Sequence, residues 1–208
     1  MNIKNRLDFN AAHTHDNDLK IIELCQAGNS DAFAYLVEKY KNMVYQLALR
    51  MTANYHDSED IAQESFLKAY RSLHQYKPSY SFSSWLYQIT LNTIRDRIRK
   101  QDLTASFSAQ PENYQEAGSP LYPNSAELAE DPEERQIRKQ NRFAMQSAIN
   151  ALSLSHREII ILRHIQNLSY YEISKILNIT LNSVKVRLHR ARVELKDMLQ
   201  EQEQENKE

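Results

Sequence analysis

The sequence predicts an all-α protein with two small helical domains joined by a flexible linker, the second of them a helix-turn-helix domain. Only two glycines and five prolines occur among 208 residues, so few positions interrupt a helix. Apolar residues recur at three- and four-residue steps rather than in alternation, which is the period of an amphipathic helix. A chain of this length can hold two small domains, each with its own core.

Charge is distributed unevenly along the chain. The formal net charge is only −1, yet residues 95–100 contain four basic residues and one acidic residue. A second basic segment, residues 185–196, has five Lys or Arg against one Glu, whereas residues 101–134 have eight acidic residues and no Lys or Arg. Local patches rather than the net charge decide what a surface attracts. The two basic segments are therefore compatible with nucleic-acid binding.

Several classes of protein are disfavoured by what the sequence lacks. Cys25 is the only cysteine, so it cannot form an internal disulfide and fits a reducing compartment. No signal peptide opens the chain, and no apolar run approaches the roughly 18 residues that span a bilayer. There is also no glycine-rich phosphate loop, zinc-ligand spacing or nucleophile beside a base. We expect a cytoplasmic protein without enzymatic activity, cofactor or metal.

The first hundred residues divide into an arm and a four-helix domain. Residues 1–16 are polar and aperiodic, which indicates a flexible N-terminal arm. An apolar stripe from Phe33 to Met51 must be buried. In the domain at residues 17–100 we expect four helices. The first ends near Gly28 and the second begins near Ser30, while the third spans about 56–73 and the fourth about 83–100.

Residues 101–130 separate this domain from the next. They contain three prolines and a glycine among scattered polar residues, with little apolar periodicity. Such a composition buries too little surface to offset the entropy of the chain, so we expect an acidic flexible linker. Asp131 is a good N-cap and opens a second domain at residues 131–199, which precedes a polar tail at residues 200–208.

Helix signals in the second domain indicate a helix-turn-helix. The capping-box patterns are Ser155 with Glu158 and Ser169 with Glu172. They predict short helices at about 155–166 and 169–177. Asn167 and Asn178 follow these helices, where a left-handed residue is needed, and Thr180 can cap a longer helix to about Leu199. A short helix, a tight turn and a basic second helix form the helix-turn-helix pattern.

The helix at about 56–73 has an acidic half. At about 100° per residue, its solvent face presents Asp60, Gln63, Glu64, Leu67 and Arg71. Asp57 as a cap, with Glu59 and Asp60 near the positive end of the helix dipole, explains the first turn without any function. These structural roles do not explain Glu64 or the exposed Leu67. Carboxylates around an exposed leucine are typical of a surface that binds a basic protein.

The helix at about 83–100 has an apolar and a polar face. The apolar stripe is Tyr87, Leu91, Ile94 and Ile98, and the polar stripe is Gln88, Asn92, Arg95 and Arg99. Ahead of them come Tyr76, Tyr80, Phe82 and Trp85. Aromatic rings beside a basic stripe suit single-stranded nucleic acid, because unstacked bases stack on rings while phosphates meet Arg. The alternative is that Phe82 and Trp85 pack into the domain.

The last helix combines a buried stripe with a basic face. The buried stripe is Val184, Leu188, Ala191 and Leu195, and the outward side chains are Lys185, Val186, His189 and Arg190. These outward residues lie in the N-terminal half, which enters the major groove in helix-turn-helix proteins. We expect Lys185 and Arg190 to contact bases, and Arg187 and Arg192 to contact the DNA backbone. A solvated basic face is the alternative.

Three segments carry a resemblance to a known family. They read DSEDIAQESFLKAYRSL from Asp57, FSSWLYQITLNTIRD from Phe82 and LSYYEISKILNITLNSVKVRLHRARVEL from Leu168. In this order and separation, they resemble the bacterial RNA polymerase sigma factors of the extracytoplasmic-function (ECF) group. The resemblance covers about residues 17–100 and 131–199. It implies an alternative, stress-responsive sigma factor that binds core RNA polymerase and directs promoter recognition, melting and transcription initiation.

The resemblance also implies roles for particular residues. The acidic helix docks on a coiled coil of the polymerase's largest subunit, which assigns Asp60, Gln63 and Glu64, to which we add the exposed Leu67. The helix at 83–100 and its preceding loop capture the melted −10 element, which assigns Tyr80, Phe82, Trp85, Gln88 and Asn92, with Arg95 from the basic stripe. The last helix reads the −35 element through Lys185, Val186, His189 and Arg190, with Arg187 beside them.

Partners and departures follow from the same resemblance. The implied partners are core polymerase, promoter DNA and an anti-sigma factor anchored in the inner membrane, while the linker threads the RNA channel of the polymerase. Gln88 stands where the family often has Arg, so one phosphate contact is missing. Asn167 and Asn178 replace common glycines, and His189 occupies a variable position that tunes −35 preference.

Three rival interpretations are open from the sequence. A stand-alone helix-turn-helix regulator would bind an operator tightly without polymerase, usually as a symmetric dimer. A polymerase-binding adaptor that contacts no DNA would have no use for the basic helix. A metal-dependent enzyme using the carboxylates near Asp57 would need converging His or Cys ligands.

Overall fold

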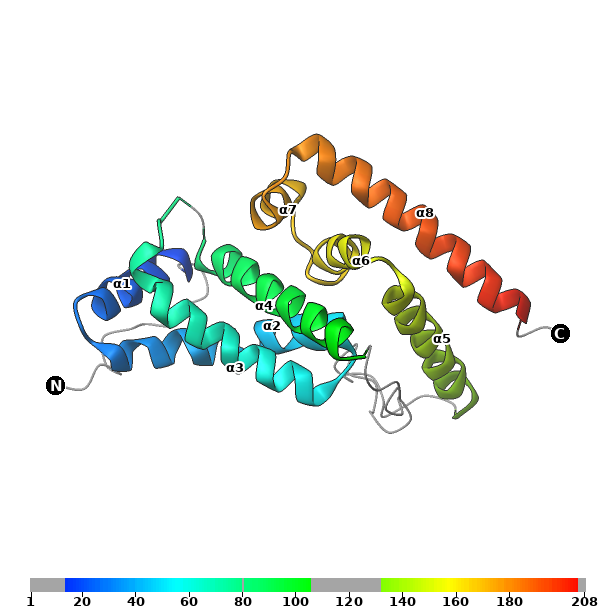
Figure 1. Ribbon diagram of the computed structural model, residues 1–208, viewed down its shortest axis with the longest axis horizontal. Coiled ribbons are helices and arrows are strands. Elements are labelled where there is room, and N and C mark those ends of the chain that lie inside the picture. Colours follow the sequence, from blue (N-terminus) through cyan, green and yellow to red (C-terminus); the bar gives the residue numbers. More distant parts are fainter. Residues whose placement is uncertain (1–13, 80, 106–131, 206–208) are drawn as a thin grey trace.

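The computed structural model describes residues 14–79, 81–105 and 132–205, and every regular element in these ranges is helical (Figure 1). The elements are α1 (Thr14–Gln26), the 3-10 turn η3 (Ser30–Ala32), α2 (Phe33–Thr52), α3 (Tyr55–Ser72), the 3-10 turn η4 (Leu73–Gln75), α4 (Phe82–Ala105), α5 (Pro132–Ala151), α6 (Leu154–Ile160), the π-helical turn η5 (Ile161–Ile165), α7 (Tyr170–Leu177) and α8 (Leu181–Glu205). The predicted all-helical class is confirmed. None of the described helices has an apolar stretch of the length that spans a bilayer.

Three helices extend further than the sequence predicted. Helix α1 begins at Thr14, inside the predicted arm, and α4 continues to Ala105, inside the predicted linker. Helix α8 continues to Glu205, inside the predicted tail. The rest of these three segments lies outside the described residues: 1–13 of the arm, 106–130 of the linker with its neighbour Asp131, and 206–208 of the tail. Helix ends depend on local contacts as well as on periodicity, so they are the least predictable part of a helix.

The first core lies among α1, α2, α3 and α4. Ile21, Leu36, Phe66 and Leu86, one from each of these helices, belong to one cluster of buried side chains. The apolar stripe of α2 is buried as predicted, with Leu36 and Val44 in this core, Leu47, Ala48 and Met51 in a second one, and all five at 0 % exposure. Burial of this stripe holds α3 and α4 against the same helix and so positions their outward faces.

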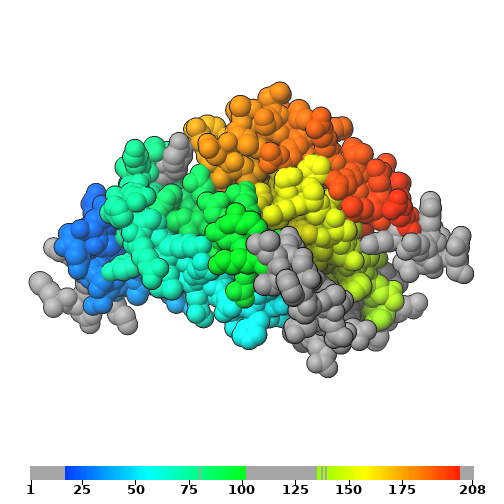
Figure 2. All heavy atoms as spheres, in the orientation of Figure 1, coloured from blue at the N-terminus to red at the C-terminus, as the bar shows by residue number. Residues whose placement is uncertain are grey.

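The second core is shared between the two halves of the chain. Leu91 and Ile94 of α4 are buried in one cluster with Ile161 of η5, Ile176 of α7 and Val184 of α8. Figure 1 shows α4 beside α6 and α7, and Figure 2 shows the corresponding green, yellow and orange surfaces in direct contact. The sequence predicted a separate core for each domain. The apolar stripe of α4 is buried as predicted, but its cluster combines Leu47 and Ile61 of the first domain with residues of the second domain.

Local capping in the second domain follows the sequence at α7 and α8. Ser169 Oγ accepts a hydrogen bond from the Glu172 amide at 3.2 Å, and a Glu172 carboxylate oxygen accepts one from the Ser169 amide at 2.8 Å. Thr180 Oγ1 accepts from the Ser183 amide at 3.1 Å. The capping box of α7 and the cap of α8 are therefore confirmed, because each needs only residues three positions apart.

The predicted capping box of α6 is wrong. This helix begins at Leu154 with Ser153 at the N-cap position, so Ser155 already lies within the helix. The Glu158 side chain is buried and forms an ion pair with Arg95 of α4. A charged partner elsewhere in the fold binds a carboxylate more strongly than a terminal amide does.

Two asparagines end the helices before the turns, as predicted. Asn167 has φ 53° and Asn178 has φ 52°, both in the left-handed region. The turn before Asn167 is a π-turn, in which the Gln166 amide donates to the Ile161 carbonyl at 3.0 Å. These turns set the angle at which α8 leaves the domain and presents its outer face.

Ser169→Ala should destabilise the protein by about 1 kcal/mol, because it leaves the Glu172 amide without its cap. Ser155→Ala should change stability by less than about 0.5 kcal/mol, because Ser155 is exposed and caps nothing. Urea unfolding followed by circular dichroism measures both. Equal losses for the two variants would contradict the assigned start of α6.

Candidate functional site

The outer face of α3 is exposed as predicted. Asp60, Gln63 and Glu64 are all exposed, and Leu67 is 55 % exposed. The first turn differs from the expectation, because Asn54 is the N-cap and its Oδ1 accepts from the residue 57 amide at 3.1 Å. The carboxylates on this helix are therefore not needed to cap it.

The acidic residues of α3 form ion pairs with α4 and within α3. Arg97 donates to Asp57 Oδ1 from Nη2 at 2.6 Å and from Nε at 2.9 Å, and to Asp60 Oδ2 at 3.0 Å. These hydrogen bonds, chiefly the one with Asp57, raise the pKa of Arg97. Glu64 pairs with Lys68 at 2.9 Å. Exposed pairs contribute only about 0–1 kcal/mol, so Asp60 and Glu64 can exchange these partners for those of another protein.

An apolar groove runs beside this face, between α2 and α3. Its apolar lining is Phe33, Ala34, Val37 and Tyr45 from α2 with Ala62, Phe66, Leu67 and Tyr70 from α3. The rings of Phe33 and Tyr70 meet edge to face with centroids 5.1 Å apart. Leu67 is thus part of a concave apolar surface whose polar lining includes Glu59, Gln63 and Lys41. Leu67 could be identified from the sequence but the groove could not, because the groove needs side chains from two helices.

The aromatic residues near the start of α4 are partly buried. Phe82 is 1 % exposed and packs against Tyr40, Tyr76 and Trp85, with ring centroids 5.4, 5.9 and 5.6 Å away. A ring so enclosed cannot stack on a base, so the prediction of Phe82 as a direct DNA contact is wrong. Trp85 retains partial exposure. Tyr80 lies outside the described residues.

The polar stripe of α4 faces the second domain. Gln88 Nε2 donates to the Lys175 carbonyl at 2.6 Å. Asn92 is exposed, and its Oδ1 accepts from Arg95 Nη1 at 2.9 Å. Gln88, Asn92 and Arg95 line one cleft whose opposite wall is residues 174–180, the end of α7 and the turn before α8. The structure therefore brings three of the predicted −10 residues together in a single cleft.

Arg95 makes the most specific contact between the two halves. Its Nε lies 2.6 Å from Glu158 Oε1 and its Nη2 lies 2.7 Å from Oε2, a bidentate arrangement. The Glu158 side chain is 3 % exposed and that of Arg95 39 %. The hydrogen bonds with Glu158 raise the pKa of Arg95, against an opposing effect of burial. Loss of the partner of a buried charge costs about 3–5 kcal/mol, so Glu158 needs Arg95 wherever it stays buried.

The outer face of α8 is arranged as predicted. Lys185, Val186, His189 and Arg190 are exposed, while Arg187 is half-buried. The opposite stripe is buried, with Val184 and Ala191 at 0 % and Leu188 at 1 % exposure. This helix therefore presents Lys185, His189 and Arg190 around the apolar Val186.

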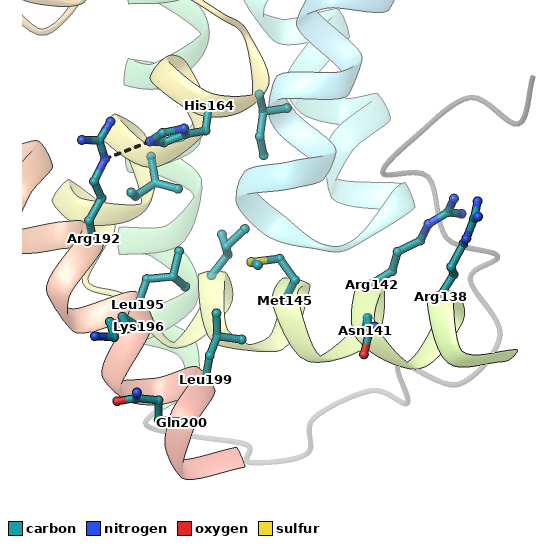
Figure 3. A pocket seen from close by; sticks show the side chains of 13 residues that line it. Arg138, Asn141, Arg142, Met145, His164, Arg192, Leu195, Lys196, Leu199 and Gln200 are labelled. Carbon is teal, nitrogen blue, oxygen red and sulfur yellow. Dashed lines mark hydrogen bonds between the residues drawn. The ribbon is translucent and has the colours of Figure 1, made fainter. Parts of the chain in front are cut away.

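A second groove lies between α5, η5 and α8 (Figure 3). Its apolar lining is Met145, Ile149, Ile160, Ile165, Leu195 and Leu199, and its basic rim is Arg138, Arg142, Arg192 and Lys196. Figure 3 shows Met145 and Leu199 entering from the two long helices, with Arg138 and Arg142 projecting at one end. An apolar floor with a basic rim suits an acidic amphipathic segment.

His164 borders this groove and interacts with α8. Arg192 Nε donates to His164 Nε2 at 3.1 Å (Figure 3). Burial, with the positive charges of Arg192 and Arg163, lowers the pKa of His164 below its ordinary 6.5. The unfolded chain therefore takes up this proton at a higher pH than the folded chain. The free energy of unfolding therefore decreases as the pH falls from 6.5 towards the lower pKa of His164 in the folded protein.

Arg192→Gln should raise the pKa of His164 towards 6.5, because it removes a neighbouring positive charge. Titration of the imidazole by NMR measures the shift. Arg187→Gln, on the same helix, provides a control of equal charge change and should leave the titration unchanged. A pKa of His164 that stays unchanged or falls in Arg192→Gln would contradict the assigned interaction.

Comparisons with known proteins identify the family. Models of sigma-70 region 2 and sigma-70 region 4 match residues 36–104 and 142–195. The ECF RNA polymerase sigma factor SigW of Bacillus subtilis (strain 168) is 36 % identical over 88 % of this chain and 96 % of its own length. This chain belongs to the ECF sigma factors. The ECF sigma-E factor of Escherichia coli (strain K12) is 29 % identical over 88 % of this chain and 94 % of its own.

Two solved structures share the fold of this ECF sigma factor. CnrH, in complex with the cytosolic domain of CnrY, has a TM-score of 0.59 at 23 % identity, covering 86 % of this chain and 95 % of that one. The sigma factor RpoE of Bartonella quintana, in complex with the anti-sigma factor NepR, has a TM-score of 0.59 at 20 % identity, covering 81 % and 96 %. Residues 36–104 are therefore region 2 of this chain, and residues 142–195 are region 4.

Sequence reasoning missed the contacts between region 2 and region 4. Tyr87 OH donates to Gln166 Oε1 at 2.9 Å, and Arg157 Nη1 donates to the Met51 carbonyl at 2.8 Å. These pairs lie 79 and 106 positions apart, and no local pattern links residues at such separations. The one available signal was Arg95, a basic residue next to a buried stripe, which could pair with a carboxylate.

Proposed function

We propose that this ECF sigma factor binds core RNA polymerase and directs transcription initiation from promoters that it recognises at their −35 and −10 elements. The observation that carries the proposal is that three separate surfaces occur on α3, α4 and α8. The first is acidic and apolar, the second polar beside aromatic rings, and the third basic. A lone regulator or an adaptor would need fewer surfaces. We place this activity in the cytoplasm and assign it no catalysis and no cofactor.

We assign core polymerase binding to the outer face of α3. The exposed carboxylates of Asp60 and Glu64 favour a basic partner, and Gln63 adds a hydrogen-bonding group. Leu67 and the groove beside it offer apolar surface that water would leave on binding. This combination suits a helical, basic element such as a coiled coil of the largest subunit.

Asp60→Lys combined with Glu64→Lys should weaken binding to core polymerase by at least about 100-fold, because like charges across an interface cost several kcal/mol. The fold should remain intact, since both side chains are exposed and their ion pairs contribute little. Co-purification with core enzyme at moderate salt measures the loss.

The matched control for this variant is Glu23→Lys with Glu38→Lys, which makes the same charge change at exposed sites on α1 and α2. It should retain core binding. Equal binding by the α3 variant and the wild type, or equal loss in the control, would remove the assignment to α3.

We assign the −10 element to the polar face of α4. The partly exposed ring of Trp85 can stack on an unpaired base, and Gln88 and Asn92 can hydrogen-bond base edges. Arg95 can bind a phosphate through the same edge that now holds Glu158. Phe82 supports Trp85 from the core.

We assign the −35 element to the outer face of α8. Lys185 and Arg190 are exposed in the N-terminal part of the helix, where a recognition helix lies deepest in the major groove. Val186 and His189 lie beside them and can contact base edges. Arg187 is half-buried and Arg192 interacts with His164, so we assign both to backbone contacts.

Lys185→Ala and Arg190→Ala should each reduce the free energy of promoter binding by about 1–3 kcal/mol. Each should also relax the preference for one base at a single −35 position. Arg187→Ala and Arg192→Ala should weaken binding to all promoters alike. The slope of log affinity against log salt concentration should be smaller by about 0.9 for each phosphate that is no longer neutralised. A −35 substitution library transcribed by each variant tests this. The assignment is wrong if the first pair keeps the wild-type ranking of sequences while the second pair changes it.

We also propose an anti-sigma factor as a regulatory partner, anchored in the inner membrane. The support is that CnrH and the RpoE of Bartonella quintana were each solved with a bound protein, CnrY and the anti-sigma factor NepR. The basic-rimmed groove between α5 and α8 offers such a partner an apolar floor and positive charge.

A further inference from the structure

We propose that region 4 blocks the −10 site of the free protein, and that Glu158 does so by occupying Arg95 as a DNA phosphate would. This proposal rests on the proposed function, because it concerns the same face of α4. Single-stranded DNA and region 4 then compete for one surface. The free chain binds the −10 strand weakly until the two regions separate.

The first support is the geometry of the ion pair. A carboxylate and a phosphate both accept two parallel hydrogen bonds from one guanidinium edge. Glu158 takes this edge of Arg95 at 2.6 and 2.7 Å. A third donor of Arg95 is directed to Asn92 of its own helix. The edge best suited to hold a phosphate is therefore filled by the chain itself.

The second support is that neighbouring −10 residues are also engaged. The side-chain amide of Gln88 donates a hydrogen bond to the Lys175 carbonyl in the last turn of α7. Residues 174–180 form the opposite wall of the cleft that contains Gln88, Asn92 and Arg95. Residues 174–180 therefore confine the approach of a nucleotide strand to these three side chains, and the Lys175 carbonyl already binds the amide of Gln88.

The third support is the burial of Glu158. This residue is 2 % exposed, so a phosphate that took Arg95 away would leave a carboxylate buried without its partner. That state is unfavourable unless region 4 moves and Glu158 reaches water. DNA binding and separation of the regions are therefore coupled through one side chain.

The apolar contacts between the regions explain why the closed arrangement is stable without DNA. Leu91 and Ile94 share a buried cluster with Ile161 and Ile176. A buried ion pair contributes little net stability compared with its separated, hydrated partners. The apolar contacts thus favour the packing of region 4 on α4, and Glu158 prevents DNA from binding Arg95 while the two regions are packed together.

The test uses the full chain and a fluorescein-labelled single strand of randomised sequence, about 15 nucleotides long. Glu158→Gln should tighten binding about fivefold or more, because a phosphate can then take Arg95 without stranding a buried charge, and the apparent Kd falls as the competent fraction rises. Fluorescence anisotropy measures the affinity. Addition of the unlabelled strand to the wild type should increase the radius of gyration in small-angle scattering.

The charge-matched control is Glu38→Gln, an exposed carboxylate on α2 that pairs with Lys41. It should leave the affinity within about twofold of the wild type, since a distant surface charge is screened. If Glu158→Gln does not fold by circular dichroism, Tyr87→Phe replaces it. That variant keeps the buried ring but loses the hydrogen bond to Gln166, and should also tighten binding.

Equal affinities for the interface variant and Glu38→Gln overturn the proposal, as does a radius of gyration that DNA leaves unchanged. Transcription with core polymerase by the same preparations separates this failure from that of the proposed function. If the wild type initiates at specific promoters but the affinities are equal, only the block by region 4 is wrong. If no preparation supports initiation, the proposed function itself fails.

Discussion

The ion pair between Arg95 and Glu158 is the interaction on which the arrangement of this molecule depends. It is the bidentate charged contact between α4 of region 2 and α6 of region 4. Because Glu158 is nearly inaccessible to water, its charge is tolerated only where the Arg95 guanidinium meets it. The pair therefore fixes how α6 lies on α4, while the apolar contacts around it supply the attraction.

Helix α4 serves two purposes that conflict. Its apolar stripe, which includes Leu91 and Ile94, is buried against region 4. Its polar stripe, with Gln88 and Arg95, carries the groups suited to an unpaired strand. Since the two stripes adjoin, packing of region 4 over the first also brings it into contact with Gln88 and Arg95 of the second. The acidic face of α3 and the basic face of α8 remain exposed in the same arrangement, so the surfaces that we propose for polymerase and for duplex DNA stay accessible in this arrangement.

Much of the fold could be predicted because its determinants are local. Periodic apolar residues placed the helices, Ser169 and Thr180 marked two helix starts, and Asn167 and Asn178 marked two stops. The same logic failed at Ser155 and Glu158, where the capping pattern is present but Arg95, 63 positions away, takes the carboxylate instead. Phe82 was misassigned for a related reason, because an aromatic residue beside a basic stripe looks the same in sequence whether its ring faces solvent or Tyr40 and Tyr76. The grooves beside α3 and α8 each combine side chains of two or more helices, so no single segment could reveal them.

This chain confers promoter specificity on RNA polymerase. The decisive experiment is transcription in vitro from a genomic promoter library, with core polymerase and with or without this chain. Addition of the chain should produce transcripts from a limited set of start sites that share −35 and −10 elements, none of which core enzyme uses alone. An unchanged set of transcripts, together with tight binding of the chain to an operator in the absence of polymerase, would contradict the claim and favour a stand-alone regulator.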